Sequence, residues 1–361
     1  MHLSKISTVA LLLGCATGAL AQSSMSTNAP PPPKPAMIMT MPPAAAADMQ
    51  AVLDAHAALG PKPIETLTPV KARLQPSAAD ATMAVMRMKG MSTAPDASVM
   101  TKDMAYGDDP MQFARVYMPA ATGGPPMPVI VYYHGGGWVI ADVNTYDAAP
   151  RLLAKQLNAI VVSVEYRHAP EAKFPAQHDD AAMAYRWVLQ NANSWGGDAN
   201  RIALAGESAG GNLAVATAIY ARDNGLAAPR HVLAVYPIAN AAMDLPSRKD
   251  SANAKPLNGA MLPWFGHYYS KTKADQMDPR INLVKADLRG LPPTTIVNAQ
   301  IDPLRSDGET LADAMRAAGD KVEQKTFPGV THEFFGMGTV VRGAYDANAY
   351  AIMRLRAAFG R

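Results

Sequence analysis

The sequence contains a single cysteine, Cys15, in 361 residues. It lies in an amino-terminal segment, residues 1–21, whose basic start, short apolar run and Ala19-Leu20-Ala21 ending are typical of a secretory signal. Cleavage after Ala21 would leave a mature protein without cysteine, which excludes stabilising disulfides even in an oxidising compartment. The apolar run is too short to span a bilayer permanently.

A second processing route stays open, because Leu12-Leu13-Gly14-Cys15 approximates a bacterial lipobox. Cleavage before Cys15 and lipidation would then anchor the protein to a membrane. We therefore expect export to the periplasm or the medium, with a lipoprotein anchored through Cys15 as the alternative.

Charge of one sign and patterns of metal ligands are also scarce. The formal net charge of +3 is small and dispersed, so we expect no nucleic-acid partner. The eight histidines are scattered and form no H-x-x-x-H pattern, and no cysteine pair exists. We expect neither a metal nor a cofactor, and the sequence does not distinguish a monomer from a homodimer.

The composition divides the remaining chain into a linker and one domain. Residues 22–47 are dominated by Pro, Ala, Ser and Met, which predicts an extended, disordered linker. Residues 48–361 are enough for one α/β domain with a buried core. Helices predicted at about 48–59 and 78–89 precede the first strands, predicted at 104–106 and 113–117. The connection at about 240–288 is long and carries a predicted helix at 261–269, so residues 48–100 and 240–288 are expected to form a helical cap.

The most informative motif is Gly206-Glu207-Ser208-Ala209-Gly210. An apolar stretch at 201–205 predicts a buried strand before it, and residues 212–220 predict a helix after it. A serine on such a sharp strand-to-helix turn exposes its hydroxyl above the sheet, and glycines two residues away on each side allow backbones to pass closely. We predict that Ser208 is a nucleophile.

A second motif, His134-Gly135-Gly136-Gly137-Trp138, follows an apolar stretch at 128–133 that predicts a strand. Acyl transfer develops negative charge on the carbonyl oxygen, and backbone N–H groups aimed at that oxygen stabilise the transition state. Glycines let the main chain approach a substrate closely. We expect Gly135, Gly136 and Ala209 to donate these N–H groups; a phosphate-binding loop is the alternative, but no P-loop lysine follows.

A nucleophilic serine needs a base and a carboxylate that orients the base. In hydrolases with this turn the chain order is Ser, Asp or Glu, then His. Asp302 follows a strand predicted at 292–299, and His332 follows a strand predicted at 322–327. We predict Asp302 as the acid and His332 as the base, because both lie beyond the carboxyl ends of strands.

Other residues compete for these roles. His231 and His267 also follow Ser208, but the first precedes a strand and the second lies in an aromatic helical stretch, so both are predicted to be structural. Asp307 and Glu309 lie in the first turn of a predicted helix, where acidic residues interact favourably with the helix dipole. Capping is the role expected for Asp307 and Glu309.

The chain resembles the hormone-sensitive lipase-like family of α/β-hydrolases, the bacterial family IV esterases. The resemblance covers most of the chain and rests on several motifs in order, which are His134-Gly135-Gly136-Gly137-Trp138, Val164-Glu165-Tyr166-Arg167-His168-Ala169-Pro170-Glu171, Phe174-Pro175, Asp179-Asp180, Gly206-Glu207-Ser208-Ala209-Gly210-Gly211-Asn212, Tyr236-Pro237, Leu291-Pro292-Pro293 and Asp302-Pro303-Leu304. It implies an α/β-hydrolase fold, with a mostly parallel central sheet flanked by helices and a helical cap. It also implies the same triad and oxyanion-hole residues.

The resemblance implies a serine carboxylesterase acting on a small-molecule ester, with short to medium acyl chains or small aromatic groups, through an acyl-enzyme. An amidase or formamidase, or a polysaccharide deacetylase, would use the same residues. A non-catalytic binding relative is disfavoured because His332 is retained. Trp138, Trp264, Phe265 and Phe334 are candidates for the substrate pocket.

The chain departs from the family pattern at three positions. Glu207 stands where many members have Asp, and His168 replaces a usual Leu, for which we expect a packing or capping role. Glu333 follows His332 where members usually have Gly. A carboxylate there would raise the pKa of the imidazole or alter the side of the leaving group, whereas a solvated side chain without such a role is the simpler expectation.

Overall fold

The computed structural model describes residues 43–120 and 124–360. The predicted signal at 1–21 and residues 22–42 of the predicted linker lie outside the described residues. Among the helices of the described residues, none is both long enough and apolar enough to cross a membrane.

The described chain forms one eight-stranded sheet in the order β1-β2-β4-β3-β5-β6-β7-β8. The strands are β1 Val99–Ala105, β2 Phe113–Pro119, β3 Met127–Tyr133, β4 Ile160–Val164, β5 Gly197–Glu207, β6 His231–Val235, β7 Thr294–Ile301 and β8 Val322–Thr331. β2 pairs antiparallel with β1 and β4, and all other neighbours are parallel. β4 and β6 are buried along their whole length, as expected for parallel strands covered on both faces. The predicted α/β-hydrolase architecture is therefore confirmed.

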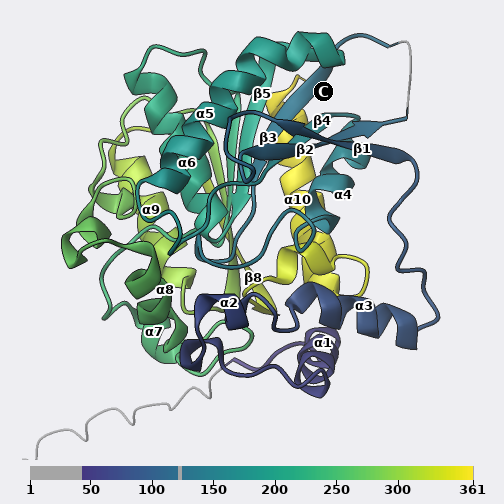
Figure 1. Ribbon diagram of the computed structural model, residues 1–361, viewed down its shortest axis with the longest axis vertical. Helices are drawn as coiled ribbons and strands as arrows, with labels where there is room; N and C mark the ends of the chain where they lie inside the picture. The colour runs from purple at the N-terminus through teal and green to yellow at the C-terminus, as the bar shows by residue number, and fades with distance from the viewer. Residues whose placement is uncertain (1–42, 121–123, 361) are drawn as a thin grey trace, which may run out of the picture. The chain divides into compact units, whose positions relative to one another are not determined.

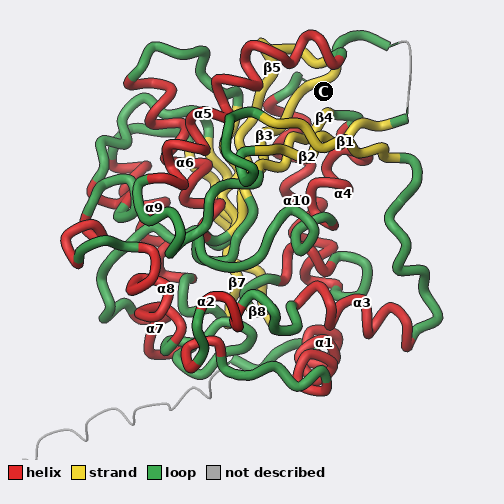
Figure 2. The backbone as a smooth tube through the Cα atoms, in the orientation of Figure 1, coloured by secondary structure: helices red, strands yellow, loops and turns green. Residues whose placement is uncertain are grey.

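Helices cover both faces of the sheet (Figure 2). Val129, Val131 and Tyr133 of β3 belong to one hydrophobic core, whereas Ile130 and Tyr132 between them belong to another. This alternation assigns the flanking helices to two layers. The first core includes residues of α5 Ala176–Asn191, α6 Ala209–Asp223 and α9 Arg305–Ala317, and the second those of α4 Ala148–Leu157 and α10 Arg342–Ala358.

Apart from η2 Ala192–Trp195 and η5 Phe334–Met337, the remaining helices precede β1 or lie between β6 and β7, and those that Figure 1 labels gather in the lower part of the view. They come from two stretches of the chain, which are α1 Ala47–Ala58, η1 Ile64–Thr66, α2 Pro69–Ala72 and α3 Ala78–Met88, and then α7 Pro246–Asp250, α8 Met261–Tyr269, η3 Lys273–Met277 and η4 Leu283–Lys285. The two stretches meet where the Trp264 indole N–H of α8 donates to the carbonyl of Leu67, at 2.9 Å. The helices predicted at 48–59, 78–89 and 261–269 are present as α1, α3 and α8.

The capping role predicted for Asp307 is wrong. Asp307 is fully buried in α9 and forms an ion pair with Arg248, at 2.9 Å. It also accepts the backbone N–H groups of Ala239 and Asn240, each at 3.1 Å. Burial raises the pKa of Asp307 to about 6, although Arg248 opposes the shift. This carboxylate ties the connection after β6 to α9, a contact that local spacing does not reveal.

Candidate active site

Ser208 lies at the junction between β5, which ends at Glu207, and α6, which begins at Ala209. Its backbone has φ 58° and ψ −118°, a conformation that is strained for a residue with a side chain. The Ser208 N–H donates to the carbonyl of Val235 in β6, at 2.9 Å. The strained turn is thus fixed to the neighbouring strand, as the motif predicts for a nucleophile elbow.

The glycines on either side of Ser208 are sterically required. A Cβ on Gly206 would lie 2.1 Å from the carbonyl oxygen of Gly210. A Cβ on Gly210 would lie 2.0 Å from the carbonyl oxygen of Tyr133 in β3. Both obstacles are backbone atoms, which cannot rotate away, so the turn leaves no room for a side chain at either position.

The structure brings the three predicted side chains into one hydrogen-bonded chain. His332 follows the end of β8 and Asp302 follows the end of β7. His332 Nε2 lies 3.0 Å from Ser208 Oγ, and His332 Nδ1 lies 2.7 Å from Asp302 Oδ2. All three residues are buried, and the Leu304 N–H donates to the other carboxylate oxygen of Asp302 at 2.8 Å.

The pKa of His332 is raised above its ordinary value. Burial alone would lower it, but the nearby carboxylate of Asp302 outweighs that effect, and Glu333 and Glu207 act in the same direction. The imidazole is therefore set up to accept and hold a proton.

The glycine loop after β3 presents free backbone donors. Within the part of the chain that the structure describes, the N–H groups of Gly135, Gly136 and Ala209 donate no hydrogen bond. Gly136 has φ 94°, and a Cβ there would lie 2.0 Å from the carbonyl oxygen of Ile140. The loop therefore needs glycine at Gly136 both for its conformation and for the close approach of backbone.

Tyr166 and the His134 side chain fix this loop from behind. The Tyr166 hydroxyl lies 2.9 Å from the carbonyl oxygen of His134 and 3.2 Å from that of Gly135. A ring nitrogen of His134 lies 2.8 Å from the Gly135 carbonyl, and the His134 and Tyr166 rings stack at 4.3 Å. In a trans peptide the N–H points opposite to the C=O, so anchoring these two carbonyls fixes the N–H directions of Gly135 and Gly136.

Comparison with known proteins gives the family. Residues 130–336 match a family described as having the alpha/beta hydrolase fold. Over 248 residues the chain is 40% identical to carboxylesterase NlhH of Mycobacterium tuberculosis, which covers 68% of this chain and 77% of that protein. The chain belongs to the hormone-sensitive lipase-like family of α/β-hydrolases.

Other esterases are also similar to the chain, in sequence and in structure. Ethyl acetate hydrolase of Pseudomonas putida is 34% identical over 240 residues, which cover 66% of this chain and 74% of that protein. An esterase structure from Pyrobaculum calidifontis superposes with a TM-score of 0.74 and 32% identity, covering 84% of this chain and 97% of that chain. A thermostable esterase structure from Pseudomonas putida gives a TM-score of 0.77 at 28% identity, covering 89% and 99%. The protein is a carboxylic ester hydrolase.

Two of the four aromatic pocket candidates in this hydrolase, Trp138 and Phe265, lie at the glycine loop. Trp138 stacks on Tyr269 of α8, with ring centroids 4.1 Å apart. A Cβ on Gly137 would lie 2.2 Å from the Phe265 ring, so α8 packs directly on the loop, and Trp264 lies beside Phe265. Phe334 differs, because it is fully buried against Tyr236 and Phe327 in the core between the sheet and α10.

A buried charged cluster lies behind the glycine loop of the hydrolase. Potential metal-ligating atoms of His134, Glu165 and His168 all lie within 4.8 Å of one another. Glu165 Oε1 lies 3.3 Å from His134 Nε2 and 2.9 Å from His168 Nε2. Burial would raise the pKa of Glu165, but the two histidines lower it to about 2. The expected packing or capping role of His168 is therefore replaced by a contact with a buried carboxylate.

Two glutamates that depart from the family pattern lie close to His332. Glu207 is buried and accepts hydrogen bonds from the hydroxyls of Tyr132 and Tyr236, and burial raises its pKa to about 7. Glu333 Oε1 lies 4.0 Å from His332 Nε2. The simpler expectation of an unengaged, solvated Glu333 is wrong, because Tyr146 donates its hydroxyl to this carboxylate.

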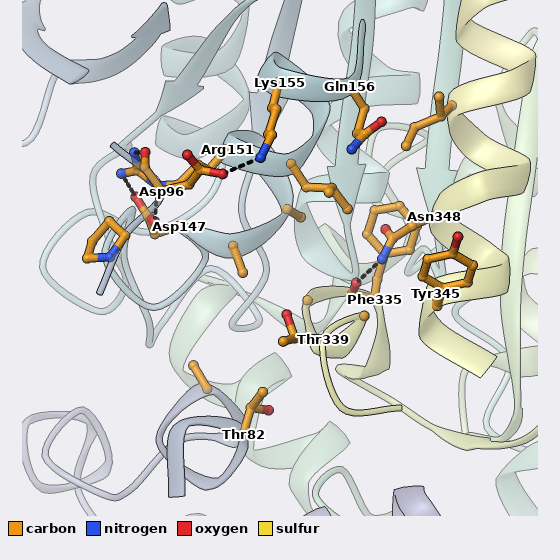
Figure 3. A pocket seen from close by; sticks show the side chains of 18 of the residues that line it. Thr82, Asp96, Asp147, Arg151, Lys155, Gln156, Phe335, Thr339, Tyr345 and Asn348 are labelled. Carbon is orange, nitrogen blue, oxygen red and sulfur yellow. Dashed lines mark hydrogen bonds and ion pairs between the residues drawn. The ribbon is translucent and has the colours of Figure 1, made fainter. Parts of the chain in front are cut away.

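A separate cavity of about 1170 Å³ lies between α3, α4 and α10 (Figure 3). Its lining includes Thr82 and Tyr345 but none of Ser208, Asp302 or His332. Of the cations at its edge, Lys155 pairs with Asp96 at 2.6 Å. A cavity of about 40 Å³, lined by Glu207, Glu333 and Tyr146 among others, lies beside it and shares several of its lining residues.

The sequence named the three side chains that the structure brings together, Ser208, Asp302 and His332, but gave no sign of the residues that hold the site in place. Tyr166 occurs in a motif that signals the family, yet its anchoring role depends on contacts across 32 residues. Tyr146 carried no signal, because its partner Glu333 is 187 residues away in the chain.

Proposed function

We propose that the protein is a serine carboxylesterase that cleaves esters through an acyl-enzyme on Ser208. The observation that carries the proposal is the hydrogen-bonded chain in which His332 lies 3.0 Å from Ser208 Oγ and 2.7 Å from Asp302 Oδ2. Beside it, three backbone N–H groups donate no hydrogen bond within the described residues. Nucleophile, base and orienting carboxylate are thus aligned beside a site for the oxyanion.

In the first half-reaction Ser208 Oγ bonds to the ester carbonyl carbon while its proton passes to His332 Nε2. The N–H groups of Gly135, Gly136 and Ala209 receive the negative oxygen. The bond from carbon to the leaving oxygen then breaks, and His332 gives its proton to that oxygen. Asp302 keeps Nδ1 protonated and stabilises the imidazolium.

In the second half-reaction water replaces the alcohol. His332 takes a proton from water while the water oxygen bonds to the acyl carbon. The bond between the acyl carbon and Ser208 Oγ then breaks. His332 returns its proton to Ser208, and the carboxylic acid leaves.

We propose short to medium acyl chains or small aromatic esters as substrates. Trp138 and Phe265 lie against the glycine loop and restrict the space above it. Relatives named ethyl acetate hydrolase and arylesterase support small substrates.

The test compares hydrolysis of p-nitrophenyl butyrate by the wild type, Ser208→Ala and His332→Ala. Each variant should lose on the order of 10⁶ in kcat, because residues that act as a unit lose nearly all activity singly. His231→Gln is the control, since His231 is a buried histidine that contacts Thr295 and not the site. Substantial activity in folded Ser208→Ala or His332→Ala protein would refute the mechanism.

A further inference from the structure

Glu333 places a carboxylate near His332 Nε2, the nitrogen that accepts and donates the proton in the proposed mechanism. Its Oε1 lies 4.0 Å from His332 Nε2, the same atom that lies 3.0 Å from Ser208 Oγ. Among the described residues, no Lys or Arg lies within 4.0 Å of this carboxylate. When His332 is neutral, the negative charge of Glu333 therefore has no ionic partner.

Tyr146 fixes the position of this charge. Its hydroxyl lies 2.7 Å from each carboxylate oxygen of Glu333. The same hydroxyl lies against the glycine loop, because a Cβ on Gly135 would come within 2.2 Å of it. The carboxylate is thus held between the imidazole and the glycine loop, and 23% of the Glu333 side chain stays exposed.

The position of Glu333 affects the leaving alcohol of the ester. The leaving oxygen must come within hydrogen-bond distance of His332 Nε2 to receive its proton. Substituents on the leaving alcohol therefore come near Glu333. In a partly buried site a fixed negative charge attracts a cationic substituent and repels an anionic one more strongly than it would in water.

We infer that Glu333 is a specificity-determining residue that favours esters of cationic alcohols, such as amino alcohols or quaternary ammonium alcohols, over neutral esters of the same shape. The inference rests on the proposed function, because it assumes that the alcohol leaves beside His332. Tyr146 is the positioning residue that keeps the carboxylate in place.

The test uses butyrylcholine and its uncharged isostere 3,3-dimethylbutyl butyrate, with acid release followed in a pH-stat. The readout is the ratio of the two kcat/KM values, because a general effect on the imidazole acts on both esters alike. Glu333→Gln should lower the cationic-to-neutral ratio about tenfold, as expected for one unscreened charge at short range. Glu323→Gln, the same change on exposed β8, should leave the ratio unchanged.

An equal ratio in wild type and folded Glu333→Gln protein would overturn the inference. Competitive inhibition of the wild type provides a measurement that needs no variant: choline should inhibit more strongly than 3,3-dimethylbutanol, and equal inhibition would also overturn it. Failure of the proposed function looks different, since Ser208→Ala would then still hydrolyse the neutral ester.

Discussion

The two sides of the active site are built by different physical means. On the side of Ser208 and the glycine loop, the positions of the atoms depend on backbone, since Gly206, Gly210 and Gly136 each face a main-chain oxygen that no side chain could avoid. On the side of His332, they depend on side chains and charge, with Asp302 and Glu333 both near the imidazole. Outside the triad, substitutions should therefore act by displacing the backbone on the first side, and electrostatically, with dependence on pH, on the second.

Among substitutions outside the triad, the largest effect should come from Gly136→Ala on the backbone side. The new Cβ would meet the Ile140 carbonyl at 2.0 Å, so the loop must move and its N–H donors with it. Loss of one such donor costs about 10²–10³ in kcat. The measurement is kcat on p-nitrophenyl butyrate.

Gly225→Ala is the matched control for Gly136→Ala. Gly225 also has a positive φ, of 63°, but nothing lies within 4 Å of a Cβ there. It should show strain without loss of kcat. Equal kcat in the two variants would mean that the close approach of the Ile140 carbonyl does not determine the position of the glycine loop.

A smaller effect should come from Tyr166→Phe. Without its hydroxyl, the carbonyls of His134 and Gly135 lose an anchor, and the oxyanion donors lose part of their alignment. We expect kcat to fall about tenfold with little change in KM, because misaligned donors weaken transition-state binding rather than substrate binding.

Tyr185→Phe removes the hydroxyl of another buried tyrosine, which donates to the carbonyl of the exposed residue Ala227 at 2.6 Å, away from the site. Both variants should be less stable than the wild type. For Tyr166→Phe we expect a loss of about 1–3 kcal/mol, because two buried carbonyls each lose a partner; for Tyr185→Phe we expect about 1 kcal/mol, because water can replace the lost hydrogen bond at the exposed Ala227. A loss of kcat in Tyr185→Phe as large as in Tyr166→Phe would show that stability alone explains the effect.

On the charge side, the smallest effect is a shift of the pH profile. The carboxylate of Glu333 helps to raise the pKa of His332, so Glu333→Gln should lower that pKa. In the proposed mechanism the free enzyme needs neutral His332 as its base, and therefore the acidic limb of kcat/KM should move to lower pH in the variant. A limb that stays in place, or moves to higher pH, would contradict this electrostatic role.

The comparison also explains what the sequence could predict. The backbone side lies in contiguous motifs, so Ser208, Gly135, Gly136 and Ala209 could all be named from local spacing. Asp302 and His332 followed from the order of residues at strand ends. The structure places these residues together, and their catalytic roles remain predictions.

Contacts between distant segments could not be predicted. The pairing of Tyr146 with Glu333 and of Arg248 with Asp307 depends on the folded chain. Phe334 follows His332 closely and looks available to substrate in sequence, yet it points into the core. Strand β1 begins at Val99 rather than at Met104, because this edge strand is mostly exposed and lacks the apolar pattern of a buried strand.

The central claim is that Ser208 carries the acyl group, and trapping tests it most directly. The wild type would be treated with a p-nitrophenyl alkylphosphonate, which bonds covalently to an activated serine, and the adduct located by peptide mass spectrometry. We expect one adduct per chain, on Ser208, with none in Ser208→Ala and much slower labelling in His332→Ala. An adduct on another residue, or full labelling of Ser208→Ala, would contradict the account.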